Sequence, residues 1–368
     1  MTGTAKKHIP RKRVAVMRLS ALGDVAIALP VLYAACRRYP DTDFVFVTKK
    51  AFAGLVTCRP DNLTVVAADT KGRHKGLPGL VRLARELRCS QLIDLHDVLR
   101  SKVVRTLLRA SGVRVTVFDK ARAAKRRLIG SGAAEAEAVS PTATRYAAAF
   151  ARAGYPVAPS GPVPVDLSLA QKEGIPVKES DEKWVGIAPF AAHFTKVYPT
   201  GSLMHVARKL LDTRENVHLL LFGGGKDETE KLRIFATGLP RTTVVAGRGL
   251  GFAGELALMS QLDVMISMDS GNMHMAAIAG TDTVSIWGPT HPACGFTPVQ
   301  CRPDQRHIFV QSDYGYRRPC SVFGEKPCTV GCVPGASPAE VPCMKAITPE
   351  DVLTAVNSIL DTPRNNRT

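Results

Sequence analysis

The chain has 368 residues and a formal net charge of +17 at pH 7, and 45% of its residues are hydrophobic. A chain of this length is too long for a single hydrophobic core, so we expect two domains of roughly 150 to 190 residues. No apolar run reaches the ~18 residues of a membrane span, and the basic residues 1–13 are not followed by the apolar stretch of a signal peptide. We therefore expect a cytoplasmic protein without membrane spans.

The positive charge is confined to the first half of the chain. Residues 1–180 contain 31 Lys or Arg against 14 Asp or Glu, whereas residues 181–368 contain 18 of each kind. A basic domain indicates a polyanionic partner, either nucleic acid, an anionic membrane surface or a phosphorylated lipid. Nucleic acid is not expected, because no known binding module is present and few aromatic side chains are available for stacking. The densest run, 120–127, also fits a solvated helix face.

Apolar runs separated by amphipathic segments predict alternating strands and helices along the whole chain. Strands are expected near 13–19, 43–48, 63–68, 91–95 and 113–118, and then near 184–189, 217–223, 242–246, 264–268 and 283–287. This alternation predicts the α/β class, with two doubly wound parallel sheets. Between the two sets of strands, a stretch rich in Pro, Gly and Ser at 156–164 and a polar run at 178–183 indicate a linker.

The first predicted strand leads into a helix through a short polar turn. Gly23 and Asp24 lie at this turn, after the apolar run 14–19. An aspartate that opens a helix is often only a cap, and the positive end of the helix dipole favours its ionised form.

A second turn of this kind follows the predicted strand 264–268. Asp269, Ser270 and Gly271 come directly after it, and His274 lies within the apolar helix that begins there. Free backbone N–H groups and the helix dipole make such an N-terminus a binding site for phosphate. A serine-capped helix without a ligand would have the same sequence pattern.

Three ordered motifs carry a resemblance to a known family. The segments RLSALGDVAIALP at 18–30, DSGNMH at 269–274 and GPTHP at 288–292 together resemble the lipopolysaccharide heptosyltransferases of glycosyltransferase family 9. Further matching segments are DLHDVLR at 94–100, KVYP at 196–199, FGGG at 222–225 and PCMKAITPE at 342–350. The resemblance extends from about residue 14 to about residue 360.

The resemblance implies the GT-B architecture, in which two Rossmann-like domains face a cleft, and an inverting glycosyltransferase. The sugar would be heptose and its donor ADP-heptose or another nucleotide diphosphate sugar. The acceptor would be the lipopolysaccharide core or another lipid-linked, anionic glycolipid, with peripheral contact to the cytoplasmic leaflet of the inner membrane. No cofactor is expected. The alternatives are a non-catalytic protein that binds a nucleotide sugar or glycolipid, and a nucleotide-sugar epimerase or hydrolase.

The domain arrangement follows from the same resemblance and from the predicted elements. We expect an N-terminal acceptor-binding domain over 1–165, a linker over 166–183 and a C-terminal domain over 184–346 that binds the nucleotide sugar and contains a cysteine-rich loop at 290–346. A C-terminal helix at 347–361 is expected to pack back toward the N-terminal domain, followed by a flexible tail at 362–368.

Asp24 is the candidate catalytic base, because it matches the presumed catalytic aspartate of the family. An acceptor hydroxyl that attacks an anomeric carbon loses its proton as the bond forms, and a nearby carboxylate can take it. The candidate donor-binding residues are Lys196, Asp269, Ser270, Gly271 and His274. The candidate acceptor-binding residues are Asp94, Asp97, Arg100, Lys125, Arg126 and Arg127, although packing or ion pairing would explain the first three equally well.

Four of the nine cysteines lie close together near the end of the chain. Cys320, Cys328, Cys332 and Cys343 form the pattern C-x7-C-x3-C-x10-C. Four thiolates could hold a structural zinc ion, but no paired C-x2-C motif is present. Free thiols or a disulfide are therefore favoured, and no metal is expected.

Overall fold

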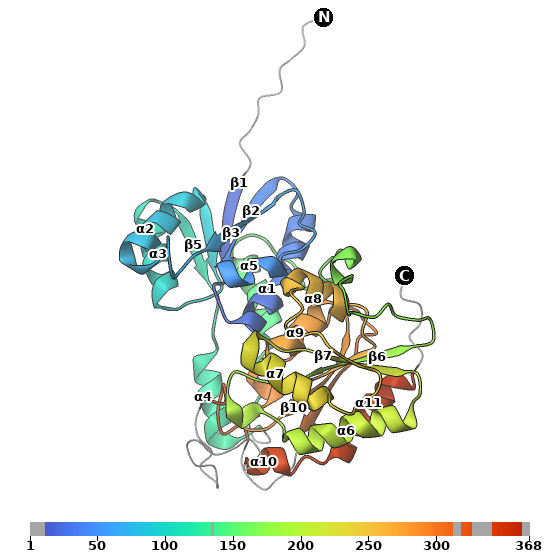
Figure 1. Cartoon of the computed structure of the whole chain (residues 1–368). Helices are drawn as coiled ribbons and strands as arrows, with labels where there is room; N and C mark the ends of the chain where they lie inside the picture. The colour runs from blue at the N-terminus through green and yellow to red at the C-terminus, as the bar shows by residue number, and fades with distance from the viewer. Residues whose placement is uncertain (1–11, 134–135, 312–317, 326–340, 363–368) are drawn as a thin grey trace, which may run out of the picture.

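The computed structural model describes residues 12–133, 136–311, 318–325 and 341–362. The first half forms a parallel sheet of five strands in the order β3-β2-β1-β4-β5 (Figure 1). Its strands are β1 (Lys12–Met17), β2 (Thr42–Lys49), β3 (Leu63–Ala68), β4 (Gln91–Asp94) and β5 (Arg114–Val117). Its helices are α1 (Leu22–Arg38), η1 (Lys50–Leu55), α2 (Gly76–Leu87), α3 (Leu99–Ala110), α4 (Arg122–Ser131) and α5 (Thr142–Arg152).

The second half forms a parallel sheet of six strands in the order β11-β10-β9-β6-β7-β8. Its strands are β6 (Lys183–Ala188), β7 (Val217–Leu221), β8 (Thr242–Val244), β9 (Val264–Met268), β10 (Asp282–Trp287) and β11 (His307–Gln311). Its longer helices are α6 (Thr200–Thr213), α7 (Gly225–Ala236), α8 (Gly251–Met259), α9 (Gly271–Ile278) and α11 (Pro349–Leu360). Short helical turns complete it: η2 (Leu167–Ala170), η3 (Phe194–Lys196), η4 (Pro292–Cys294) and α10 (Pro342–Lys345).

The two parallel sheets confirm the predicted α/β class, and each of the ten expected strands is present. Strand β11 was not expected. It lies at the edge of the second sheet, and only one of its five residues is buried, so it lacks the apolar run that marks an inner strand. The segment 290–346 therefore contains a strand and is not a continuous loop.

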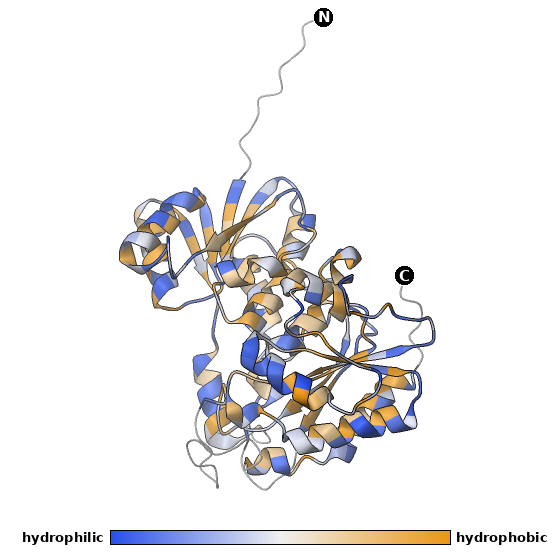
Figure 2. Cartoon of the chain, viewed as in Figure 1, coloured by the Kyte–Doolittle hydropathy of each residue, from blue (hydrophilic) through white to orange (hydrophobic). Residues whose placement is uncertain are grey.

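Helix α1 is buried between the two halves of the molecule. Every residue from 25 to 36 is buried, and α1 packs against α9 of the second half (Figure 1). A helix enclosed on all sides needs apolar residues all round, which explains its uniformly apolar sequence. The outer helix α6 alternates hydrophilic and hydrophobic residues instead (Figure 2).

Helix α4 also joins the two halves. It leaves the first sheet and packs against η4, with Leu128 and Cys294 in one buried cluster. The chain that follows contacts the second half once more, because the N–H of Val139 donates to the carbonyl of Ala293 at 2.8 Å. Helix α5 then returns to the first half and packs on α1 and β5. None of the helices in the described ranges is long and apolar enough to cross a membrane.

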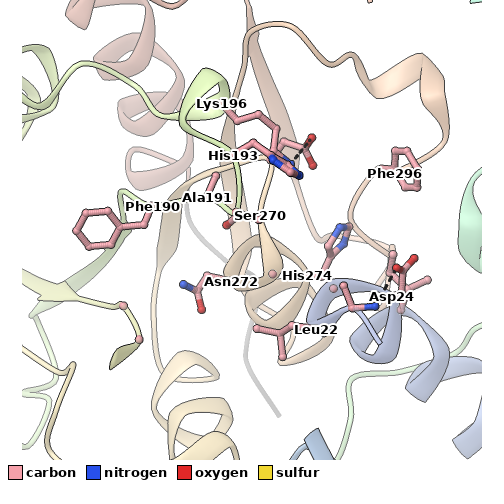
Figure 3. A pocket seen from close by; sticks show the side chains of 18 of the residues that line it. Leu22, Asp24, Phe190, Ala191, His193, Lys196, Ser270, Asn272, His274 and Phe296 are labelled. Atoms are coloured by element: carbon pink, nitrogen blue, oxygen red, sulfur yellow. Dashed lines mark hydrogen bonds and ion pairs between the residues drawn. The ribbon is translucent and has the colours of Figure 1, made fainter. Parts of the chain in front are cut away.

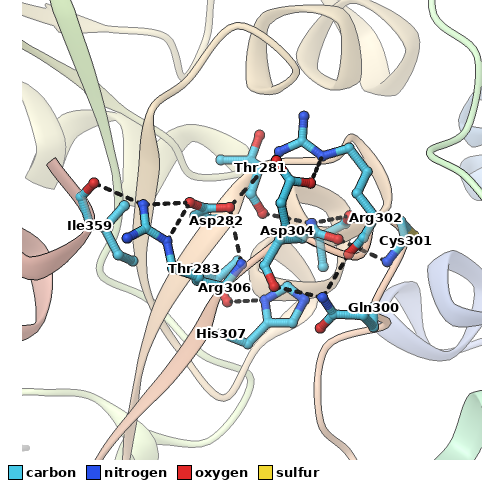
Figure 4. Close-up of polar contacts among 12 residues, drawn as sticks. Thr281, Asp282, Thr283, Gln300, Cys301, Arg302, Asp304, Arg306, His307 and Ile359 are labelled. Carbon is cyan, nitrogen blue, oxygen red and sulfur yellow. Dashed lines mark hydrogen bonds and ion pairs between the residues drawn. The ribbon is translucent and has the colours of Figure 1, made fainter. Parts of the chain in front are cut away.

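The expectation that the C-terminal helix packs toward the N-terminal domain is wrong. Helix α11 packs on α6, β9, β10 and β11, and its buried residues Val352, Val356 and Ile359 join the core of the second sheet. The guanidinium of Arg306 also donates to the carbonyl of Ile359 at 2.9 Å and to Asp282 at 3.3 Å, which ties the end of α11 to β10 (Figure 4). The apolar face of α11 is thus needed to cover its own sheet.

Candidate functional site

A cleft of about 860 Å³ lies between the two halves and is lined by residues of both. The turn before α1 and the turn before α9 both face it, because the carboxyl ends of parallel strands open toward the same side of a sheet. Residues at this cleft that the sequence predicted are Asp24, Lys196, Asp269, Ser270, Gly271 and His274 (Figure 3). All candidates for the base and the donor site therefore meet in one cavity.

Two glycines let the first turns of α1 and α9 approach each other. A Cβ atom on Gly23 would lie 2.5 Å from Cδ2 of His274, and one on Gly271 would lie 2.6 Å from Cδ2 of Leu22. Neither distance is compatible with a side chain unless a neighbour moves. Gly271 is therefore required by helix packing, a reason that the sequence did not reveal.

Asp24 is held in place by a buried arginine. Its carboxylate forms an ion pair with Arg18, and its Oδ2 accepts the N–H of Ala21 at 3.3 Å. The other guanidinium nitrogen of Arg18 donates to the carbonyl of Leu95 at 2.6 Å. Burial opposes the charge of Arg18, but Tyr146 and Asp24 raise its pKa above the ordinary value. Arg18 is a site residue that the sequence reasoning missed, although it opens the first family motif.

The donor side of the cleft contains a buried ion pair. Nζ of Lys196 lies 3.3 Å from Oδ2 of Asp269, and the hydroxyl of Thr290 donates to the same oxygen at 2.8 Å. Both charged side chains are buried. Asp269 therefore positions Lys196 and the loop around it.

Ser270 occupies the N-cap position of α9 but does not cap the helix with its side chain. Its Oγ is buried and forms no hydrogen bond within the described part of the chain. The first N–H groups of a helix also have no partner inside the helix. This N-terminus can therefore accept an anionic group from the cleft.

His274 is a neutral ring at the contact between α1 and α9. Burial lowers its pKa to about 4, and its Nδ1 has no hydrogen-bond partner in the described ranges. At neutral pH it can contribute a neutral hydrogen bond to a ligand, but no positive charge.

Asp94 and Asp97 have structural roles and do not line the cleft. Asp94 is fully buried, accepts the N–H of His96 at 2.9 Å and pairs with Arg105 at 3.1 Å. Asp97 pairs with Arg105 and Arg122, each at 2.9 Å. The sequence placed these two carboxylates among the candidate acceptor-binding residues, whereas in the structure the arginines of neighbouring helices satisfy them. Arg100 is exposed on α3.

The run at 125–127 does not form one basic face. Arg126 and Arg127 are exposed, whereas Lys125 is buried with its Nζ 3.9 Å from the centre of the Phe296 ring. Burial lowers the pKa of Lys125 to about 8. Helical geometry explains the difference, because neighbouring residues on a helix point in different directions.

The cysteine cluster is only partly covered by the described residues. Cys320 is exposed and Cys343 is half-buried, while Cys328 and Cys332 lie outside the described ranges. Within those ranges, no group of three or more His, Cys, Asp or Glu side chains could hold a metal ion.

Several lining residues were not identified from the sequence. Glu228 and Glu255 face the cleft, and so do the aromatic residues Phe252, Phe296 and Phe323. The carboxylate of Glu228 accepts the N–H of Gly224 at 2.7 Å. These residues lie outside the family motifs, so no local pattern marks them.

Two Rossmann-like parallel-sheet domains with a cleft between them define the GT-B architecture of glycosyltransferases. Residues 80–313 match the sequence model of glycosyltransferase family 9 (heptosyltransferase), and the chain belongs to this family. It is therefore a glycosyltransferase.

Individual relatives agree with this assignment. Lipopolysaccharide heptosyltransferase 1 of Pseudomonas aeruginosa is 26% identical over 345 residues, which cover 86% of this chain and 87% of the relative. The glycosyl transferase family 9 structure from Veillonella parvula has a TM-score of 0.72 at 19% identity and covers 97% of this chain and 100% of its own. The structure of E. coli heptosyltransferase WaaC with ADP has a TM-score of 0.62 at 16% identity. The match covers 94% of this chain and 99% of the WaaC chain.

Proposed function

We propose that this enzyme transfers heptose from ADP-heptose, with inversion at the anomeric carbon, to the lipopolysaccharide core or another lipid-linked acceptor. The family and the Pseudomonas relative support the heptosyl group, and the ADP in WaaC supports the nucleotide. The observation that carries the proposal is the meeting of Asp24 with Lys196 and the free N-terminus of α9 in one cleft.

In this proposal the donor's diphosphate binds at the start of α9. The backbone N–H groups there and the unpaired Oγ of Ser270 donate to the phosphate oxygens. Lys196, oriented by Asp269, adds a positive charge where negative charge grows as the diphosphate leaves. The buried position of this ion pair strengthens the effect, because the local dielectric constant is low.

Asp24 acts as the general base. The acceptor oxygen attacks the anomeric carbon from the side opposite the diphosphate, and its proton passes to the Asp24 carboxylate as the carbon to diphosphate bond breaks. A single displacement of this kind inverts the anomeric configuration. Arg18 fixes the carboxylate so that one oxygen is oriented toward the cleft.

The acceptor is assigned to the basic domain at 1–165 and the donor to 184–346. The exposed cations Arg100, Arg126 and Arg127 are available to bind an anionic glycolipid or the cytoplasmic leaflet of the inner membrane. Asp94, Asp97 and Lys125 have no place in this contact, because other side chains already engage them.

The test is transfer itself. Purified enzyme is incubated with ADP-heptose and a deacylated lipopolysaccharide-core acceptor, and the anomeric configuration of the product is read by NMR. Product with inverted configuration supports the proposal. Tight ADP-heptose binding without product formation from any core acceptor would favour the non-catalytic binding protein instead.

A further inference from the structure

One carboxyl group in the cleft has no function in the mechanism above. Glu255 lies on α8 and faces the cleft together with Gly251 and Phe252. In the described part of the chain its carboxyl forms no hydrogen bond or ion pair, and burial is the one cause of its raised pKa. The other carboxylates that line the cleft, Asp24, Asp269 and Glu228, each have a hydrogen-bond donor or a cation. Glu255 is therefore left available to a ligand.

The order of strands indicates which end of the donor lies near Glu255. The proposed diphosphate site follows β9, in the middle of the second sheet. Asp24 and Phe296 lie on one side of it, and Phe190 lies on the other (Figure 3). Phe190 lies next to Gly223, because a Cβ on Gly223 would lie 3.3 Å from the Phe190 ring. Gly223 follows β7, so this second side of the diphosphate site is the side of β7.

The reacting sugar must lie beside Asp24, so the nucleoside extends from the diphosphate to the opposite side. That side is formed by the loop after β7, which contributes Gly223 and Gly224, and by the first turns of α8, which contribute Gly251 and Glu255. Gly224 and Gly251 bring no side chain into this side of the cleft, and Phe252 also lines it.

We propose that Glu255 recognises the nucleobase of the donor through hydrogen bonds to its edge and selects adenine. This inference rests on the proposed function, because it requires a nucleotide-sugar donor in the cleft. It names the side chain that distinguishes one nucleotide from another.

The chemistry of the carboxyl group supports adenine. Burial raises the pKa of Glu255 to about 7, so at neutral pH a large share of the molecules carry the neutral acid. A neutral carboxyl group offers one O–H donor and one C=O acceptor, which matches the amino group and the ring nitrogen of adenine. An ionised carboxylate is only an acceptor, which matches the N–H groups of guanine.

Among the described residues, no charged side chain on the elements packed against α8 pairs with Glu255. The elements packed on α8 are η1, η2 and α9, and their ionisable side chains are Lys50 on η1 and His274 on α9. His274 is neutral through burial, and neither side chain forms an ion pair with Glu255 in the described ranges. Asp24 across the cleft is paired with Arg18.

The experiment is calorimetric titration of the full chain with ADP and with GDP between pH 6 and pH 8, without acceptor. We expect the affinity for ADP relative to GDP to fall by about tenfold over this range, because the neutral acid is lost as pH passes the pKa of about 7. Protonation of the terminal phosphate affects ADP and GDP alike, so it cancels in the ratio of the two affinities.

Two variants and a control complete the test. Glu255→Gln keeps one donor and one acceptor, so it should bind ADP within about threefold of wild type, with a ratio that no longer depends on pH. Glu255→Leu should lower ADP affinity by about tenfold or more and abolish the preference. The control Glu230→Gln removes an exposed carboxylate on α7 and should change neither quantity.

The outcomes separate this inference from the donor proposal. If wild type and Glu255→Gln show the same pH dependence and the same preference, the nucleobase assignment is overturned while ADP binding stands. If wild type binds no ADP at any pH, the proposed donor itself fails, whatever the variants do. Thermal melting of each variant shows whether a lost affinity reflects lost folding.

Discussion

At the scale of single residues, the pair formed by Asp24 and Arg18 explains why a carboxylate can act as a base here. The guanidinium is anchored to the carbonyl of Leu95, so it holds the carboxylate in one orientation. Fixed geometry contributes to proton transfer as much as base strength does.

Replacing Asp24 by Asn should abolish transfer while leaving donor affinity nearly unchanged. Loss of a positioned general base costs ~10²- to 10⁴-fold in rate. ADP binding should stay within a few-fold, because Asp24 is not assigned to the nucleotide. Turnover numbers and calorimetric ADP affinity test this together. Turnover close to wild type would remove Asp24 from the mechanism.

Replacing Lys196 by Ala should weaken ADP binding by about tenfold or more. The substitution removes a buried charge next to the diphosphate site and leaves Asp269 without its cation. The matched control is Lys231→Ala, which removes an exposed lysine of α7. Equal ADP affinity in the two variants would contradict the placement of the diphosphate at α9.

At the scale of elements, the contact between α1 and α9 depends on residues without side chains. Gly271→Ala places a Cβ against Leu22, and overpacking of this kind typically costs about 1 to 3 kcal/mol. We expect a lower melting temperature, and we expect Leu22→Ala in the same chain to restore part of it. If the double variant is no more stable than Gly271→Ala alone, the Leu22 contact is not the reason for the glycine.

Helix α4 supplies a second test, because only two of its three consecutive cations are exposed. Arg126→Ser with Arg127→Ser should raise the Michaelis constant for an anionic acceptor and leave that for the donor unchanged. Added salt should have the same effect, since exposed charges are screened beyond ~10 Å at 0.1 M. The control is Arg208→Ser with Lys209→Ser on α6. An acceptor constant that ignores both substitutions and salt would make these residues a solvated face.

Sequence alone could predict the parts of the fold and site that local pattern determines. Both cleft-facing turns, Asp24 and Ser270, follow buried strands, and carboxyl ends of parallel strands open to one side. Contacts between elements distant in sequence determine the rest. They decide that Arg18 pairs with Asp24, that Lys125 is buried and that Glu255 has no partner in the described part of the chain. Such contacts leave no local pattern, and neither does the docking of α11.

At the scale of the whole molecule, the two sheets share one buried core through α1, α8 and α9. The cleft therefore opens beside a continuous apolar contact between the domains. Three histidines with hindered access to solvent have lowered pKa values in this structure: the buried His96, at about 3, and the buried His274 and half-buried His307, each at about 4. Partial or full burial is the largest cause in each.

These histidines make stability depend on pH. An unfolded histidine takes up a proton near pH 6.5, whereas the folded ones do so only near pH 4 or below. The unfolded state therefore binds more protons between these values, and stability falls as pH falls from about 6.5 toward 4, by about 1.4 kcal/mol per pH unit for each histidine. Glu255 has the opposite effect, because its pKa is raised to about 7 in the folded state. Between about pH 7 and pH 4.5 the folded state binds the extra proton, so stability rises as pH falls and the contribution of one of the three histidines is offset.

The last prediction isolates one of these groups. His307 lies away from the cleft, where its ring nitrogens contact the hydroxyl of Thr283 at 2.8 Å and the carbonyl of Val299 at 3.3 Å (Figure 4). His307→Asn removes one titrating ring, so the slope of unfolding free energy against pH between 6 and 5 should decrease by about 1.4 kcal/mol per unit. The wild-type chain, titrated in parallel, supplies the reference slope. Denaturant titrations at each pH measure both slopes, and an unaltered slope in His307→Asn would mean that this ring is protonated in the folded state as readily as in the unfolded chain.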